Sequence, residues 1–327
     1  MKIKQIPEDF KVTEVINLNL VQNKTNYTIW KLTKKGWDSF KIIQTLAKIL
    51  KTKTKFIGYA GNKDKQAITT QYLSFYKIHK EAIENIKIKD IILEFIGYAP
   101  DRINLGTLKG NEFKLILRDL TKEAGLPKEL QLENYFDEQR FGNKANTHLV
   151  GKAILKKEFK EACTLLNLEV KNNDSIGAIR TEQRRLLRFY ISSFQSYIWN
   201  KNLAAILRKE KEYKEISYEF GNLVFTTTKV KNFKLPLINF DTETDKILDN
   251  LLKEEGISKE DFLIKSIPEL ISETQEREAF IEVKDIRCTW SKDELNKGKR
   301  KVEVCFFLPK GSYATLLTKK IDLLLEA

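Results

Sequence analysis

The chain has 327 residues, of which 42% are apolar, so it is long enough for two cores or for one domain that carries a large insertion. Its 58 lysines and arginines outnumber its 45 acidic residues, which gives a formal net charge of +13 and a pI of about 9.3. This balance favours a polyanionic partner such as a nucleic acid, because each basic side chain set against a phosphate releases a condensed counterion. An anionic membrane surface is the competing partner.

The composition also bears on location and cofactors. No segment approaches the ~20 apolar residues that a membrane span needs, and the first ten residues have a charged middle, unlike a signal peptide. We therefore expect a cytoplasmic protein. Cys163, Cys288 and Cys305 are far apart and the only histidines are His79 and His148, so no close metal-binding spacing is present. Carboxylates, lysines and aromatic side chains are left to carry any chemistry, without a metal or cofactor.

Strands and one helix are predicted in the first third of the chain. Alternating side chains favour strands at residues 10–15 and 27–32, which we interpret as a hairpin. Apolar residues at helical spacing predict a helix over residues 39–50, followed by a lysine-rich run. Four further strands are expected, at residues 55–60, 70–76, 91–98 and 112–117. Together they indicate an α+β sheet domain.

After Gly142 the pattern changes, which indicates another domain. Two helices are predicted there, at residues 149–166 and 181–206. Strand patterns return at residues 279–290 and 301–308, joined through a polar stretch, and a short helix begins at Ala314. We expect these last strands to rejoin the first sheet.

The segment of residues 58–71 is the first that could carry chemistry. Asp64 lies between Lys63 and Lys65, just after a strand that ends at Tyr59. Two cations beside a carboxylate favour its ionised form, which suits a nucleophile or a base. The alternative is a solvated charged turn, and the triplet alone favours that alternative. The spacing does not fit a phosphate-cradling P-loop.

The segment of residues 134–142 has groups suited to holding an unpaired base. The amide of Asn134 can read a base edge, and aromatic rings such as that of Phe136 can stack on a base. The alternative is a strand that packs its aromatic face on a core. Two glycine-bearing turns with a lysine, at residues 105–113 and 308–315, could bind phosphate or merely connect two elements.

Taken in order, these segments resemble the TruD family of pseudouridine synthases. The matching segments span the chain: residues 3–10, 61–71, 106–113, 134–142, 194–200 and 308–315. The resemblance implies a pseudouridine synthase catalytic core, an α+β fold around an antiparallel sheet, interrupted by a mostly helical α+β insertion domain. It places the catalytic domain at residues 1–142 and 276–327 and the insertion domain at residues 143–275.

The resemblance also carries residue roles. The family's catalytic aspartate falls on Asp64, and its substrate-contacting phenylalanine and asparagine fall on Phe10 and Asn134. The aromatic residue of the last motif falls on Tyr313. The lysine before the Pro-Glu-Asp-Phe motif falls on Lys4, which could pair with Asp64 or with the RNA backbone.

Three more residues are candidates for substrate binding. Phe136 could stack on the base, while Lys63 and Lys65 could keep Asp64 charged and lie near phosphate. Two departures from the family pattern are visible: Asp137 stands where glycine is common, and Tyr313 stands where some members have phenylalanine. Asp137 adds negative charge near a site that must accept RNA.

The implied reaction breaks the N1–C1′ bond of a uridine, turns the base and rejoins it through C5. The resemblance points to uridine 13 of tRNA, although other structured RNAs are alternatives. Basic residues that could line an RNA cleft, or merely form solvated faces, are Lys51 to Lys55 with Arg180, Arg184, Arg185 and Arg188.

Two other classes of function compete. A non-catalytic RNA-binding or RNA-folding protein would keep the basic surface and do no chemistry. A nucleobase deaminase would need zinc ligands that the sequence lacks. The sequence indicates no oligomeric state.

Overall fold

The structure is a computed structural model that describes residues 1–142 and 144–326. Contacts between Cα atoms divide the chain into two compact units. Unit 1 comprises Met1–Leu130 and Val283–Ala314, and unit 2 comprises Gln131–Glu282 and Thr315–Ala327. The predicted insertion domain begins at Asn143, and the predicted last part of the catalytic domain ends at Ala327. Both of these residues lie outside the described ones, and the predicted domain boundaries stay predictions.

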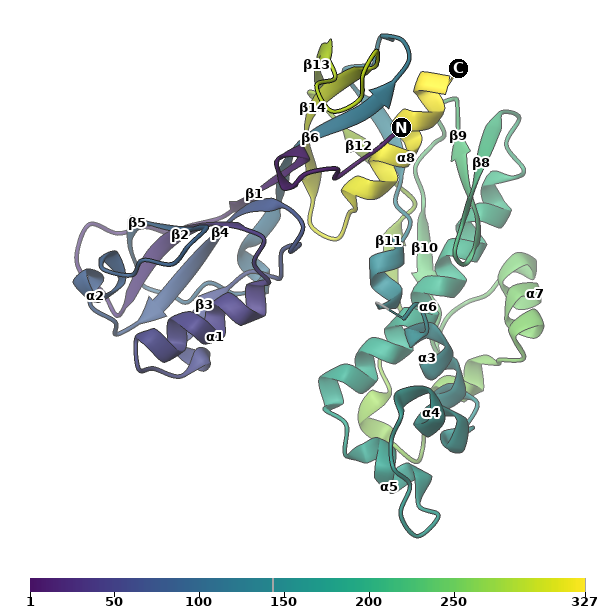
Figure 1. Ribbon diagram of the computed structural model, residues 1–327. Helices are drawn as coiled ribbons and strands as arrows, with labels where there is room; N and C mark the ends of the chain where they lie inside the picture. Colours follow the sequence, from purple (N-terminus) through teal and green to yellow (C-terminus); the bar gives the residue numbers. More distant parts are fainter. Residues whose placement is uncertain (143, 327) are drawn as a thin grey trace. The chain divides into compact units, whose positions relative to one another are not determined.

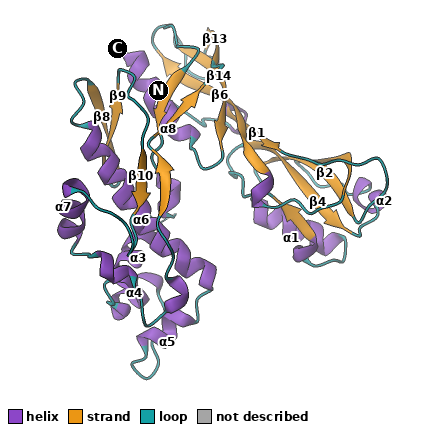
Figure 2. Cartoon of the chain, turned by 180° about the vertical axis from the view of Figure 1, so that it is seen from behind, coloured by secondary structure: helices purple, strands orange, loops and turns teal. Residues whose placement is uncertain are grey.

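Unit 1 is built on one eight-stranded sheet, seen from two sides in Figures 1 and 2. Its strands are β1 (Phe10–Ile16), β2 (Tyr27–Lys35), β3 (Ile57–Tyr59), β4 (Ile68–Tyr76), β5 (Ile91–Ala99), β6 (Leu108–Leu120), β13 (Arg287–Lys292) and β14 (Arg300–Pro309). The order is β13-β14-β6-β1-β4-β2-β5, with β3 paired to β4. The expectation that the last strands rejoin the first sheet is confirmed, as is the α+β class with a mainly antiparallel sheet.

The predicted hairpin of the first two strands is wrong. Strands β1 and β2 both form, but β4 lies between them, antiparallel to β2 and parallel to β1. Alternating side chains indicate a strand without indicating its partner, and here the partner comes from about 55 residues further along the chain. Because β1 and β4 are parallel, their first residues lie at the same edge of the sheet, with Lys11 opposite Ile68.

The predicted helix after β2 is confirmed as α1 (Ser39–Ile49). The side chain of Asp38 caps its first turn by accepting hydrogen bonds from the backbone N–H groups of Phe40 and Lys41. The helix buries its apolar face in a cluster formed with the neighbouring strands; this cluster includes Trp30, Leu32, Ile42, Ile43, Leu46, Leu73 and Phe75. A second, short helix, α2 (Lys80–Glu84), adds Ile83 to the same cluster.

Unit 2 is organised around α6 (Arg184–Leu207), a helix buried along much of its length. The other helices are α3 (Thr147–Leu155), α4 (Phe159–Leu166), α5 (Ser175–Arg180), α7 (Lys246–Glu255) and α8 (Ala314–Glu326). Strands form three pairs: β7 (Leu130–Glu133) with β12 (Phe280–Val283), β8 (Tyr213–Tyr218) with β9 (Gly221–Thr226), and β10 (Lys234–Leu237) with β11 (Gln275–Glu278).

Short 3-10 turns occur in both units. Those of unit 1 are Pro7–Asp9, Thr54–Phe56 and Leu105–Thr107, and those of unit 2 are Glu138–Phe141, Lys259–Phe262 and Pro268–Leu270.

Two long predicted elements are interrupted. The expected helix at residues 149–166 is two helices, α3 and α4, because Lys157 takes a left-handed conformation (φ 62°) between them. The expected strand at residues 279–290 is likewise split into β12 and β13, with Asp285 at φ 55° between them. Neither break is marked by glycine or proline, so the sequence pattern gave no signal of it.

Among the described helices, none is long and apolar enough to cross a membrane.

Candidate active site

The loop between β3 and β4 places Asp64 beside the first residue of β1. Asp64 lies four residues before β4 begins, and Phe10 is the first residue of β1. Since these two strands are parallel neighbours, both residues come to the same edge of the sheet. Chain positions more than fifty residues apart therefore meet at one site in unit 1.

The carboxylate of Asp64 is fixed at both oxygens. Oδ2 accepts a hydrogen bond from Lys4 Nζ, and Oδ1 accepts one from the backbone N–H of Gln66 at 3.1 Å. The side chain keeps 29% of its surface exposed. Burial opposes ionisation, but the hydrogen bond and charge of Lys4, the Gln66 N–H and the charge of Lys34 together hold the pKa of Asp64 below its usual value. The site thus presents an ionised, accessible carboxylate at neutral pH.

Lys4 links Asp64 to Phe10. Its Nζ lies 4.1 Å from the centre of the Phe10 ring while it pairs with Asp64. Pairing with Asp64 was one of the two partners predicted for this lysine. Phe10 itself is 6% exposed and packs edge-on against Phe113, with ring centres 6.1 Å apart. Lys4, Phe10 and Asp64 are therefore brought together as the sequence predicted, and their roles toward a substrate stay predictions.

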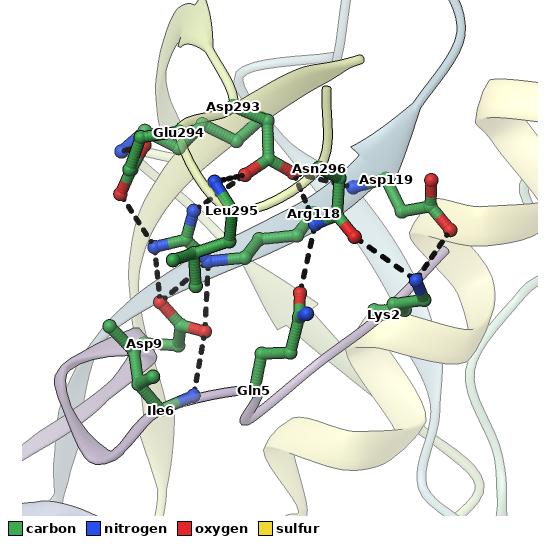
Figure 3. A network of polar contacts seen from close by, with 11 residues as sticks. Lys2, Gln5, Ile6, Asp9, Arg118, Asp119, Asp293, Glu294, Leu295 and Asn296 are labelled. Atoms are coloured by element: carbon green, nitrogen blue, oxygen red, sulfur yellow. Dashed lines mark hydrogen bonds and ion pairs between the residues drawn. The ribbon is translucent and has the colours of Figure 1, made fainter. Parts of the chain in front are cut away.

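A buried arginine holds the segment that carries Lys4 (Figure 3). Arg118, on β6, is 1% exposed and binds Asp9 through Nε and Nη2, with 2.8 Å between Nη2 and Oδ1. It also binds Asp293 at 2.8 Å and Glu294 at 3.0 Å, both in the β13–β14 hairpin. Asp9 in turn accepts from the backbone N–H of Ile6. The network therefore fastens the N-terminal segment to the same sheet that carries the Asp64 loop.

The two lysines that flank Asp64 differ in burial. Lys63 turns inward, where its Nζ lies 2.6 Å from Glu14, a fully buried carboxylate that also accepts from the backbone N–H of Tyr72. Lys65 is exposed. The cations that dominate the pKa of Asp64 are Lys4 and Lys34, and not its sequence neighbours. Consecutive side chains of an irregular loop face different directions, so adjacency in the chain was a poor guide to contact.

Lys34 is a further residue of this site that sequence reasoning missed. It shares the buried face of β2 with Trp30 and Leu32, and it lies beneath the Asp64 loop. A lysine in phase with two apolar positions of a strand was the available signal. Glu14 was missed in the same way, because it stands in phase with the buried positions of β1. Arg118 was missed because it lies out of phase with Phe113, Leu115 and Leu117, the buried positions that precede it on β6.

Asn134 and Phe136 belong to unit 2, where Arg277 holds both. The guanidinium of Arg277 donates to the side-chain oxygen of Asn134 at 2.6 Å and stacks 4.2 Å from the centre of the Phe136 ring. Asn134 also donates from its amide nitrogen to the backbone oxygen of Glu278. Phe136 packs edge-on against Trp199. Asn134 and Phe136 are 7% and 8% exposed, so each is held in one orientation.

Tyr313 follows the end of β14 in unit 1 and is half-buried. Its motif adjoins the other glycine-bearing turn, because Pro309 pairs with Gly110 across β14 and β6. A Cβ atom at Gly110 would lie 2.2 Å from the carbonyl oxygen of Leu308, so only glycine permits this close pairing. The structure thus joins residues 105–113 to residues 308–315.

In residues 1–142 and 144–326, no group of three or more His, Cys, Asp and Glu side chains is arranged to hold a metal ion.

Comparison with known proteins gives one consistent result. The family profile described as tRNA pseudouridine synthase D (TruD) matches residues 1–170 and 234–321. A probable tRNA pseudouridine synthase D 2 of Methanocaldococcus jannaschii is 30% identical over 98% of this chain and 91% of its own length. The tRNA pseudouridine synthase D of Aquifex aeolicus is 24% identical over 98% of both chains.

A solved structure agrees with the sequence relatives. The crystal structure of the putative tRNA pseudouridine synthase D of Methanosarcina mazei superimposes with a TM-score of 0.70 and 29% identity, covering 96% of this chain and 92% of that one. The matches span both units, including the loop that carries Asp64. The chain therefore belongs to the tRNA pseudouridine synthase D (TruD) family.

Proposed function

We propose that this chain converts uridine to pseudouridine in tRNA, at position 13, with Asp64 as the reacting carboxylate. The observation that carries the proposal is the ionised, partly exposed carboxylate of Asp64, held by Lys4 beside the ring of Phe10. Membership of a family of tRNA pseudouridine synthases supports the substrate. The same relationship supports action in the cytoplasm.

The chemistry needs an unprotonated carboxylate by either of two routes. Asp64 attacks C1′ and forms a covalent ester as the uracil anion leaves, or it removes a ribose proton so that the uracil leaves with formation of a glycal. In both, the detached uracil turns and C5 bonds to C1′. In the first route the ester bond from Asp64 to C1′ breaks as this bond forms, and in the second the proton held by Asp64 returns to the ribose. C5 then loses its proton and N1 gains one. No redox partner is consumed. The cation of Lys4 favours the ionised form in which either route begins.

Aromatic and amide groups would hold the extruded base. Phe10 is placed at Asp64, and its ring could replace part of the stacking that a flipped uridine loses. Asn134, Phe136 and Tyr313 stay proposed base contacts. Arg277 supports this assignment for the first two, because it fixes the amide and the ring in defined orientations.

The proposed RNA backbone contacts are basic groups that lack acidic partners. In unit 2, a cavity of about 550 Å³ is lined by residues that include Arg185 and Arg188. Within the described residues Arg188 donates only to the backbone oxygen of Glu269, and neither arginine forms an ion pair, while Glu273 also lines the cavity. In unit 1, Lys53 and Lys55 are exposed at the end of the α1 segment. Such uncompensated charges suit phosphate, whose binding weakens with salt.

Two transcripts test the substrate and the position. The protein is incubated with an unmodified tRNA and with the same tRNA carrying cytidine at position 13, and pseudouridine is mapped by carbodiimide labelling. We expect one new pseudouridine, at position 13, in the first transcript and none in the second. Modification at another uridine in both transcripts would contradict the position while leaving the activity in place.

The competing function is RNA binding without chemistry. It predicts salt-dependent tRNA binding with an unchanged pseudouridine content. The same carbodiimide assay separates the two functions, because binding alone leaves every uridine unmodified.

A further inference from the structure

We infer that Lys34 is a positioning residue for Asp64: its buried ammonium group hydrogen-bonds the backbone of the loop that carries Asp64 and places a positive charge close to it. The inference rests on the proposed role of Asp64. It concerns a residue outside the motifs that suggested the function, and it is carried by three contacts and by the burial of the side chain.

The three contacts of Lys34 join two turns. Its Nζ donates to the backbone oxygen of Trp37 at 2.6 Å, to that of Asp64 at 3.0 Å and, more weakly, to that of Lys63 at 3.4 Å. The turn after β2 and the loop before β4 are thus fastened to one ammonium group. Ser39 adds to the clamp, because its hydroxyl accepts from the backbone N–H of Lys63 at 2.8 Å.

Lys34 is unusual among the buried cations of unit 1. It is 1% exposed, yet all three of its hydrogen-bond acceptors are neutral carbonyl oxygens, and no carboxylate lies in ion-pair contact with it within the described residues. An unpaired buried charge is costly, and a neutral side chain of similar length would avoid that cost. The placement of a lysine here therefore points to a role for its charge or for its three donors.

The charged groups that face Lys34 come from each element around it. Asp38 caps α1 and Asp64 lies on the loop, and both favour the protonated lysine; Lys63, also on the loop, opposes it. Burial outweighs the two carboxylates and lowers the pKa of Lys34 to about 8. In return, the charge of Lys34 helps to lower the pKa of Asp64. The clamp should therefore hold at neutral pH and weaken as Lys34 loses its proton.

Single-turnover rates of pseudouridine formation test this inference in three variants. Lys34→Met removes the charge and the donors, and Lys34→Arg keeps a charge at all pH values used. Lys31→Met is the control, because it removes a half-buried lysine of the same strand that pairs with Glu94. Each rate is measured from about pH 5.5 to 9.5, with the affinity for tRNA and the thermal midpoint recorded alongside.

In the wild type we expect the rate to fall above about pH 8, as Lys34 deprotonates. Lys34→Met should lose on the order of 10- to 100-fold in rate with an unchanged affinity, because a misplaced reacting group slows chemistry and not binding. Lys34→Arg should move the alkaline limb upward, and Lys31→Met should match the wild type.

A folded Lys34→Met protein with the wild-type rate and pH profile would overturn the inference. If Lys34→Met does not fold, Lys34→Arg decides, and an alkaline limb identical to that of the wild type would overturn the inference. Either of these two results would overturn only the role of Lys34, and the proposed function would stand as long as Asp64→Asn is inactive. An active Asp64→Asn protein would instead remove the proposed function itself.

Discussion

Arg118 and Lys34 are two buried cations of unit 1, and they are stabilised in opposite ways. Arg118 is surrounded by carboxylates: it binds Asp9, Asp293 and Glu294. Within the described residues, Lys34 is bound only by backbone carbonyl oxygens. Each holds a segment of the site, the first the N-terminal residues that carry Lys4, and the second the loop that carries Asp64.

The difference is visible in their proton affinities. Burial opposes the charge of Arg118, but its three acidic partners raise its pKa above the ordinary value, whereas burial lowers the pKa of Lys34 to about 8. We conclude that the Arg118 network acts as a structural anchor, and that Lys34 leaves positive charge uncompensated where Asp64 can use it.

Breaking the Arg118 network should have the largest effect on stability. Arg118→Met leaves Asp9 and Asp293 buried without a cation, which should lower the free energy of unfolding by about 3–5 kcal/mol. Urea titration measures this loss. Glu294→Gln is the control, because 54% of that side chain is exposed and the change should cost below about 1 kcal/mol. Equal losses in the two variants would mean that burial of the carboxylates does not set the cost.

Removing Lys63 should have the next largest effect. Lys63→Met leaves only Glu14 buried without its cation, so we expect a loss of roughly 3 kcal/mol in the same titration. Adding Glu14→Gln should restore part of this stability, because a neutral amide is cheaper to bury than a carboxylate. A double variant less stable than Lys63→Met would show that Glu14 has another partner of equal weight.

His148 in unit 2 extends the comparison to a buried base in an aromatic cage. Burial lowers its pKa to about 4, with Glu255 opposing and Lys152 adding to the shift, and rings of Phe141, Tyr197 and Phe220 surround it. Because the unfolded chain takes up a proton first, near pH 6.5, stability is lost as the pH falls from there toward 4. The loss should reach roughly 2–3 kcal/mol.

His148→Phe should abolish that part of the pH dependence. The difference in unfolding free energy between wild type and variant, measured at a series of pH values, isolates it from the titration of carboxylates. A difference that does not change below pH 6.5 would mean that His148 is charged in the folded protein.

The sequence predicted elements better than it predicted their partners. Helix α1 follows from the spacing of Ile42, Leu46 and their neighbours, which is a local property. The pairing of β1 with β4 is not local, and it is this pairing that brings Phe10 to Asp64. Family resemblance supplied Lys4 and Phe10, since no local pattern connects either residue to a loop more than fifty positions away.

The cations near Asp64 show the same limit of prediction from local sequence. Local reasoning gave Asp64 the cations next to it in the chain, Lys63 and Lys65, while the structure gives it Lys4 and Lys34. The direction of the pKa shift was right, but its source was not. Lys34 and Glu14 were visible only as charged residues in phase with buried positions of a strand, a pattern that indicates burial but not the partner. Arg118 lacked even this signal, because it is out of phase with the buried residues before it on β6.

Whether Asp64 is the reacting carboxylate is tested most directly by comparing Asp64→Asn with Asp90→Asn, a change of the same kind at an exposed aspartate. Pseudouridine formation in unmodified tRNA is measured under single-turnover conditions for both variants. We predict a loss on the order of 1,000-fold or more for Asp64→Asn, with unimpaired tRNA binding, because the amide can neither attack C1′ nor accept a proton. Asp90→Asn should react at the wild-type rate. An Asp64→Asn protein that forms pseudouridine at a near-normal rate would contradict the account.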